Sequence, residues 1–324
     1  MAKPTNVVDR YNLNPGVRED LTDFITNVSP KETPLSTMFG RATAKQTYHE
    51  YQRDAYRAPN AANAAIDGDD ADRSVRTMPE RVGNYTQIIE DAYGVSGTGE
   101  AVDLAGRRSE MAYEGAKCAI ELKRDLEARI VSNLVAVAGA TGTPRQMAAL
   151  APHFHTNANH GAGGSTPVHT SGAQTVAPTA GTLRPLTSAL VTAVAQSCYV
   201  NSGSAPKLFV MSPAHKVAFG GITGISAQRT ETRQKPVTII AATDAILTDF
   251  GEIKLVPHYM MVGSNTILGI NPESNKLAYL RPWKKWKLAK TGDSESEQLL
   301  CEVTLQVKSQ RDQGKIADLT LTGL

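Results

Sequence analysis

The chain has 324 residues, of which 41% are apolar and 20% charged, which is enough for one large domain or two ordinary ones. Its 34 basic and 32 acidic side chains nearly cancel, which argues against a polycation that condenses nucleic acid. Three scattered cysteines form neither a disulfide framework nor a zinc pattern. Because no apolar run is long enough to span a bilayer or serve as a signal core, we expect a soluble protein made inside a cell.

The first segment carries two short apolar helical faces. Leu21, Phe24 and Ile25 have the spacing of one helical face, and a second short turn is expected after Pro34. Each face could pack on its own domain or dock on a neighbouring subunit. We therefore predict an N-terminal arm over residues 1–44, with these three apolar side chains as candidate interface residues.

An extended hairpin is predicted next, over residues 45–100. The stretches 48–56 and 85–95 are rich in the Tyr, Ile and Val typical of strands. Between them lies a polar tip with too little apolar bulk to pack by itself, and such a long loop suggests a function. The candidate interface residues in this segment are Arg53, Arg57, Arg73 and Arg76.

The strongest local pattern predicts a long helix over residues 103–138. Leu122, Leu126, Ile130 and Leu134 recur every four residues in a stretch without proline. Thirty-six residues at 1.5 Å each would make a helix about 50 Å long, which suits a strut.

The middle of the chain begins with an uncharged loop and continues as a mixture of helices and strands. No charged residue occurs from Gln146 to Leu183, which favours contact with other protein. A helix is expected from Pro185 to about Gly203, with an apolar face made of Leu186, Ala189, Leu190, Ala193 and Val194. Further strands are predicted at 207–211, 237–242 and 253–256, with a helix after Ser212-Pro213.

The C-terminal region ends in a strand with strict alternation. From Leu299 to Val307 every second residue is apolar, which predicts a half-buried strand with Cys301 in the core. The order of helices and strands predicts an α+β fold.

Motifs that would indicate catalysis are incomplete. His49-Glu50 lacks the second histidine of a zinc protease, and Asp249-Phe250-Gly251 lacks the other kinase motifs. A metal site among the histidines of the uncharged loop, His153, His155, His160 and His169, is a minor alternative, because no acid or cysteine accompanies them. We predict no catalytic residue, no metal and no cofactor.

One basic segment stands out. Residues 281–290 contain five basic side chains, two tryptophans and no acid. Basic residues interleaved with aromatic ones suit a nucleic-acid backbone. The alternative, which we favour, is a subunit interface in which the tryptophans are buried and the lysines face acids. The candidate interface residues are Arg281, Trp283 and Trp286.

Several strings, taken in order, resemble the major capsid proteins of tailed bacteriophages with the Hong Kong 97-like fold. They are the stretch from Gly16 to Pro34, Gly142-Thr-Pro144 after the long helix, Lys207 to Pro213, Thr248 to Gly251, Leu280-Arg-Pro282 and Lys290 to Asp293. Each string is weak alone, and their shared order carries the resemblance over nearly the whole chain.

The resemblance implies a domain organisation. Residues 1–44 would be the N-terminal arm and 45–100 the extended loop. A peripheral domain would comprise 101–144 and 262–324 with a spine helix over 103–138, and 145–261 would hold the axial domain and a connecting loop. No lysine occurs between Lys45 and Lys117, so the lysine cross-link that some relatives make from this loop is excluded.

The resemblance also implies a function. The chain would self-assemble as pentamers and hexamers into the icosahedral head shell of a virion, formed in the host bacterial cytoplasm. Expected partners are a portal protein, scaffolding or decoration proteins, and packaged double-stranded DNA bound without sequence specificity, with no membrane contact. The alternatives are an encapsulin-type nanocompartment shell, a hydrolase with an unrecognised site, and a nucleic-acid-binding protein that uses 281–290.

Overall fold

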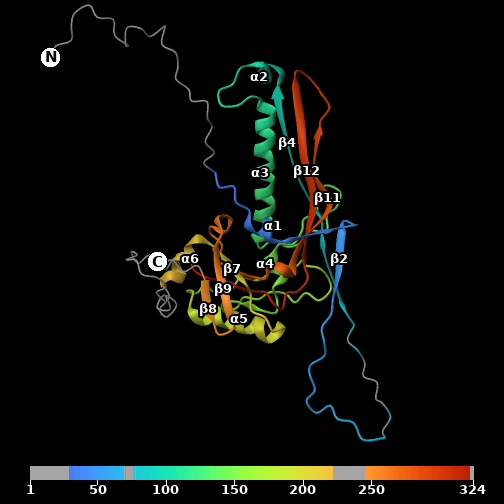
Figure 1. The fold of residues 1–324 in the computed structure, drawn as a ribbon, viewed down its shortest axis with the longest axis vertical. Coiled ribbons are helices and arrows are strands. Elements are labelled where there is room, and N and C mark those ends of the chain that lie inside the picture. Colours follow the sequence, from blue (N-terminus) through green and yellow to red (C-terminus); the bar gives the residue numbers. More distant parts are fainter. Residues whose placement is uncertain (1–28, 69, 71–75, 77, 222–244, 322–324) are drawn as a thin grey trace, which may run out of the picture.

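The chain forms helices and three β-sheets (Figure 1), which confirms the α+β class. The computed structural model describes residues 29–68, 70, 76, 78–221 and 245–321, so the predicted strand 237–242 and helix 21–28 lie outside it. The elements are α1 (Pro34–Met38), β1 (Gly40–Thr43), β2 (Tyr48–Arg53), β3 (Glu80–Tyr85), β4 (Gln87–Ser96), α2 (Gly97–Ala101), α3 (Glu110–Val131), α4 (Leu150–His153), β5 (Ala158–Asn159), β6 (Gly172–Ala173), α5 (Ser188–Ser202), β7 (Leu208–Met211), α6 (Pro213–Gly221), β8 (Ala245–Thr248), β9 (Gly251–Pro257), η4 (Tyr259–Met261), β10 (Ile267–Ile270), η5 (Pro272–Ser274), β11 (Asn275–Lys287), β12 (Ser294–Val307) and β13 (Gly314–Ile316). Within the described ranges, no helix is long and apolar enough to cross a membrane.

A four-stranded sheet and the helix α3 form one half of the body. The strand order is β1-β11-β12-β4, with β1 parallel to β11 and the other pairs antiparallel. The helix lies alongside β4 and β12 (Figure 1). Its residues Leu122, Leu126 and Ile130 are at most 2% exposed, as their four-residue spacing predicts.

The helix is shorter than the predicted span of 103–138, and this prediction was wrong at both ends. Its 22 residues make it about 33 Å long. Gly106 turns the chain with a φ of 75°, and the Ser109 hydroxyl then caps the helix by accepting a hydrogen bond from the Ala112 N–H at 3.2 Å. Beyond the helix, Arg129 donates to the Val135 carbonyl at 2.9 Å and so ties the following, non-helical segment to the end of the helix. Leu134, expected on the apolar face, is 55% exposed.

A six-stranded sheet forms the other half, in the order β5-β13-β10-β7-β9-β8. The helix α5 covers it, and three residues of the predicted face take part: Val194 is buried, and Leu190 and Leu186, which precedes the helix, pack against the core. Its buried residues are Val191, Val194, Ala195 and Cys198. Ala189 and Ala193, also predicted on this face, are exposed, and the helix starts at Ser188 and not at Pro185. It ends as predicted at Gly203, whose φ of 77° is the left-handed conformation that glycine adopts readily.

The two halves do not coincide with the predicted domain boundaries. Strands β10 and β13 fall within 262–324, which was assigned to the peripheral domain, yet both pair inside the six-stranded sheet. The chain therefore crosses between the sheets after β10 and again after β12. Short buried strands look alike in sequence, so their composition does not indicate which sheet each one joins.

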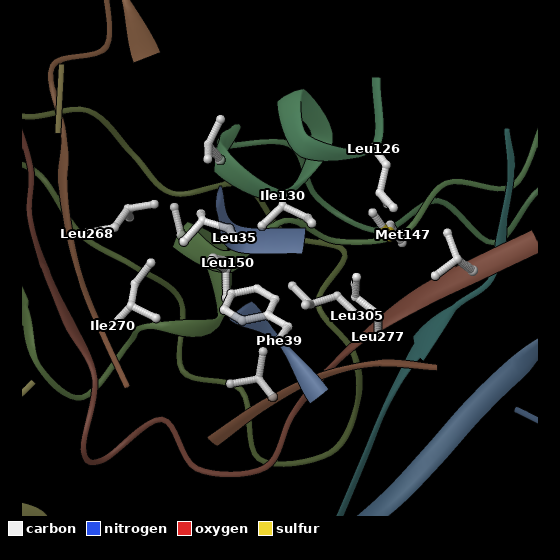
Figure 2. Packing of buried hydrophobic residues seen from close by; sticks show 14 of the residues in the cluster. Leu35, Phe39, Leu126, Ile130, Met147, Leu150, Leu268, Ile270, Leu277 and Leu305 are labelled. Carbon is white, nitrogen blue, oxygen red and sulfur yellow. The ribbon is translucent and has the colours of Figure 1, made fainter. Parts of the chain in front are cut away.

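The larger core shows that the segment around α1 packs on its own chain. In Figure 2, Leu35 and Phe39 lie among Ile130 of α3, Leu277 of β11 and Leu305 of β12. Leu35 and Phe39 are 1% and 4% exposed, and each such burial contributes about 1.5–3 kcal/mol. Residues 34–43 thus belong to the body, so the predicted arm 1–44 is too long at its C-terminal end.

The last long strand, β12, is buried on both faces from Leu300 to Leu305, so the predicted half-buried strand was wrong there. Cys301, Val303 and Leu305 lie in the core as expected. On the opposite face Glu302 is 3% exposed and Thr304 is fully buried. The Glu302 carboxylate is paired with Arg145 at 2.7 Å and with Arg281 at 2.8 Å, which makes its burial possible.

Candidate assembly surfaces

The hairpin of β2 and β3 extends away from the body (Figure 1). Its register pairs Tyr48 with Tyr85 and Arg53 with Glu80. The predicted pairing of 48–56 with 85–95 was wrong, because most of the second stretch is β4, which pairs with β12 instead. The switch between sheets occurs at Thr86, whose hydroxyl donates to the buried Glu302 carboxylate at 2.7 Å.

The base of the hairpin is held to the body by tyrosines. The Tyr48 and Tyr85 rings lie 4.9 Å apart, and a Cβ at Gly83 would meet the Tyr48 ring at 2.6 Å. The Tyr51 hydroxyl accepts a hydrogen bond from the Val307 N–H at 3.2 Å. Burial raises the pKa of Tyr51 to about 12. The direction in which the hairpin leaves the body is therefore fixed at its base.

The four candidate arginines of this segment do not share one environment. Arg53 is used inside its own chain, since it pairs with Glu80 at 3.3 Å and donates to the His169 carbonyl at 3.0 Å. Arg57 and Arg76 are exposed. Arg73 lies outside the described residues, as do Leu21, Phe24 and Ile25.

The part of the hairpin beyond Arg53 displays apolar side chains to solvent. Tyr56 is 104% exposed, Ile66 77% and Met78 84%. An isolated subunit gains no stability from such residues, whereas a contact with another protein would bury them. We call residues 54–79 the hairpin tip.

The basic segment 281–290 forms the outer part of β11 and the turn that follows it, and we call it the basic strand. Three of its five cations are paired within the chain: Arg281 with Glu302 at 2.8 Å, Lys285 with Glu297 at 2.7 Å, and Lys287 with Glu295 at 3.4 Å. Lys284 and Lys290 are exposed. Most of its charge is thus compensated by the neighbouring strand β12.

The two tryptophans of the basic strand have different roles. Trp283 packs against the larger core, whereas Trp286 is 41% exposed beside Leu288 at 42%. Strand β1 pairs with β11 only from Lys276 to Tyr279, so within the described part of the chain the edge beyond Arg281 has no neighbour opposite β12. An exposed edge with apolar side chains is a surface on which another chain can dock.

The four loop histidines form no single cluster. The rings of His153 and His169 are 5.8 Å apart, whereas His160 lies between Asp318 at 3.1 Å and Thr166 at 2.7 Å. Burial disfavours the charged rings and lowers the pKa of His153 to about 3 and that of His169 to about 4. Among the described residues, no group of three or more His, Cys, Asp or Glu could hold a metal ion.

Sequence reasoning missed Glu127, which joins three parts of the body. Its fully buried carboxylate accepts hydrogen bonds from the N–H groups of Leu35 at 2.7 Å and Ser36 at 2.8 Å, and from His258 Nε2 at 3.0 Å. It thereby links α1, α3 and the end of β9. A single acid on a helix gives no signal of this kind in sequence, because its partners lie 91 to 131 residues away.

Comparisons with known proteins agree on one family. Residues 3–320 match the SU10 major capsid protein family. The major capsid protein of Escherichia phage Phieco32 is 33% identical over 132 residues, which is 41% of this chain and only 37% of that relative. The structure resembles the Cyanophage A-1(L) capsid asymmetric unit with a TM-score of 0.67 and 13% identity, covering 95% of this chain and 99% of that one.

The fold is also shared with an encapsulin. The SrpI encapsulin of Synechococcus elongatus PCC 7942 matches with a TM-score of 0.53 and 11% identity, over 98% of this chain and 97% of that one. At such identities the likeness of structures shows the fold alone, the Hong Kong 97-like capsid fold. The match over residues 3–320 goes further, and the chain belongs to the SU10 major capsid protein family.

Proposed function

We propose that many copies of this chain tile the icosahedral head shell of a tailed phage, as pentamers and hexamers around a double-stranded DNA genome. The observation that carries the proposal is an exposed hairpin tip with three solvent-facing apolar side chains on a chain of this family. A shell subunit meets several neighbours at once, so modest contacts add up to a stable assembly. The shell would form in the host cytoplasm, with portal, scaffolding and decoration proteins as further partners.

The hairpin tip is proposed to contact the basic strand of a neighbouring subunit. Residues 58–72 contain four acids and no base, whereas 281–290 contain five bases and no acid. Apolar side chains accompany both charge patterns, with Ile66 in the tip and Trp286 in the strand. Opposite charges around an apolar centre favour a specific orientation of the two chains.

The remaining candidate interface residues do not all have the same role in the proposed contact. Arg57 and Arg76 are exposed in the hairpin tip and are proposed to contact the neighbour, whereas Arg53 supports the base of the hairpin. For Leu21, Phe24, Ile25 and Arg73, the proposed contact rests on their sequence alone.

DNA binding by the basic strand is a weaker proposal. Three of its five cations are already paired with carboxylates of β12, so the charge available for phosphate groups is small. We propose that packaged DNA is contacted without sequence specificity, and that the basic strand serves mainly the contact between subunits.

Electron microscopy of the purified protein, with sedimentation beside it, tests the shell. We expect closed shells or rings of five and six subunits. A variant in which residues 58–72 are replaced by Gly-Ser-Gly should keep the unfolding midpoint of the subunit and lose assembly. Its matched control replaces the same residues by a Gly/Ser segment of equal length, which separates loss of contacts from shortening. A small closed oligomer such as a dimer for the unaltered protein would contradict the shell.

A further inference from the structure

Two connections between the sheets run side by side. The first, η5, leads from β10 to β11, and the second, residues 308–313, leads from β12 to β13. They are joined by a hydrogen bond from the Lys308 N–H to the Ser274 carbonyl at 2.9 Å. The Asn275 side chain donates to Gln313 Oε1 at 2.7 Å. These crossings form a polar junction between the four-stranded and the six-stranded sheet.

At the centre of this junction lies a carboxylate without a cationic partner. Asp312 is 7% exposed, and its Oδ2 accepts hydrogen bonds from Asn271 Nδ2 at 3.0 Å and from the Ser274 hydroxyl. In the described part of the chain, Asp312 makes no ion pair. Other buried acids of this protein, such as Glu302, are paired with arginine. Burying a carboxylate is unfavourable unless a cation or sufficient hydrogen bonds compensate its charge.

Two oxygen atoms at the same place also lack partners. Asp312 Oδ1 and Asn271 Oδ1 are both buried, and neither accepts a hydrogen bond from a residue that the structure describes. Asn271 is 8% exposed, and its Nδ2 donates to the Asp312 carboxylate at 3.0 Å, so the two unsatisfied oxygens belong to side chains in direct contact. Native proteins rarely leave such groups unsatisfied.

We propose that Asp312, Asn271 and Ser274 form a site for a hard cation of the Ca²⁺ class. Carboxylate, amide and hydroxyl oxygens are the ligands that Ca²⁺ takes in flexible geometry, whereas Mg²⁺ demands a near-ideal octahedron. With one formal charge among the ligands, the site is a weak one, with a Kd in the range of about 10⁻⁴ to 10⁻³ M. The cation neutralises the buried charge and ties the two connections together. This inference does not rest on the proposed shell function.

Thermal unfolding of the full-length protein with Ca²⁺ or with EDTA, at constant ionic strength, tests the site. With Ca²⁺ at roughly ten times its Kd, we expect the unfolding midpoint to rise by about 2 °C. Calorimetric titration with Ca²⁺ should give about one ion per subunit at this site, and Mg²⁺ should shift the midpoint less. Sedimentation under the same conditions records the assembly state, so that an effect on the subunit is distinguished from an effect on assembly.

The variant Asp312→Asn distinguishes a cation site from a merely buried acid. Because it removes the uncompensated charge at nearly constant shape, it should be at least as stable as the unaltered protein in EDTA and should gain nothing from Ca²⁺. The control Glu252→Gln removes an exposed acid on β9 and should keep the full Ca²⁺ response. Absence of a Ca²⁺ shift in the unaltered protein, or an equal shift in Asp312→Asn, would overturn the proposal.

Discussion

Single buried polar residues decide how the parts of this subunit are joined. Glu127 accepts three hydrogen bonds from two other segments, and His258 Nδ1 accepts one from the Met260 N–H at 3.2 Å. Because Nδ1 accepts, His258 donates through Nε2 to Glu127. The carboxylate thus holds α1 and the residue after β9 against the helix α3.

Replacing Glu127 should therefore destabilise the subunit strongly. Glu127→Ala leaves two buried donors, the Leu35 N–H and His258 Nε2, and the half-buried Ser36 N–H without an acceptor, and we expect the free energy of unfolding to fall by about 3–5 kcal/mol. Urea unfolding followed by circular dichroism measures this. The control Glu121→Ala, half-exposed on the same helix, should change the value by less than about 0.5 kcal/mol. Equal effects of the two substitutions would show that Glu127 does not join these segments.

The buried histidines predict how stability depends on pH. The folded-state pKa values of His153 and His169, about 3 and about 4, lie below the unfolded value of about 6.5. At pH values between these pKa values the unfolded chain binds more protons than the folded chain does. The free energy of unfolding is therefore highest above about pH 6.5 and falls as the pH drops toward 4. Each histidine contributes up to about 1.4 kcal/mol per pH unit.

Unfolding midpoints measured from pH 7.5 to 4.5 test this dependence. In His153→Asn the slope should be smaller, whatever the variant's absolute stability, because one of the titrating groups is gone. An unchanged slope would mean that the folded and unfolded chains bind protons equally at His153 in this window.

At the scale of elements, the sequence correctly predicted some helix ends that depend only on residues a few positions away. The Ser212-Pro213 cap and the left-handed Gly203 both lie where expected, because a cap needs only residues a few positions away. The ends of α3 and the partner of β2 were predicted wrongly. The partner of β2 depends on a distant group, through the hydrogen bond from Thr86 to Glu302. The ends of α3 are set nearby, by Gly106 and the Ser109 cap before it and by the hydrogen bond from Arg129 to Val135 after it. The basic strand could be predicted from its sequence, because its residues are consecutive. The polar junction could not, because only the fold brings its residues together.

The approach of α5 to the six-stranded sheet requires a glycine in β13. A Cβ at Gly314 would lie 2.8 Å from the Asn157 carbonyl and 2.9 Å from the Val194 side chain. We expect Gly314→Ala to separate the helix from the sheet and to cost about 1–3 kcal/mol. A methyl group at Gly221 would meet no atom of the described residues within 4 Å, so Gly221→Ala serves as the control. Thermal unfolding measures both variants, and equal unfolding midpoints for Gly314→Ala and Gly221→Ala would contradict this close approach.

At the scale of the whole molecule, a body of two joined sheets carries one long projection. The body is fixed by its cores and by buried groups such as Glu127 and Glu302. The hairpin tip has no comparable support among the described residues, although its base is held by Tyr48 and Tyr51. Stability of the subunit and assembly of the shell should therefore depend on separate sets of residues.

Reversing the charges of the two proposed contact surfaces tests whether assembly and subunit stability depend on separate residues. Lys284→Glu with Lys290→Glu makes the basic strand repel the acidic hairpin tip, so assembly should fail while the unfolding midpoint stays within about 2 °C. Asp67→Lys with Asp70→Lys should fail in the same way. A chain that carries all four substitutions restores opposite charges and should regain assembly, which light scattering and electron microscopy would detect. If the fourfold variant assembles no better than either double variant, the tip and the basic strand do not meet in the shell, and the tip contacts another surface.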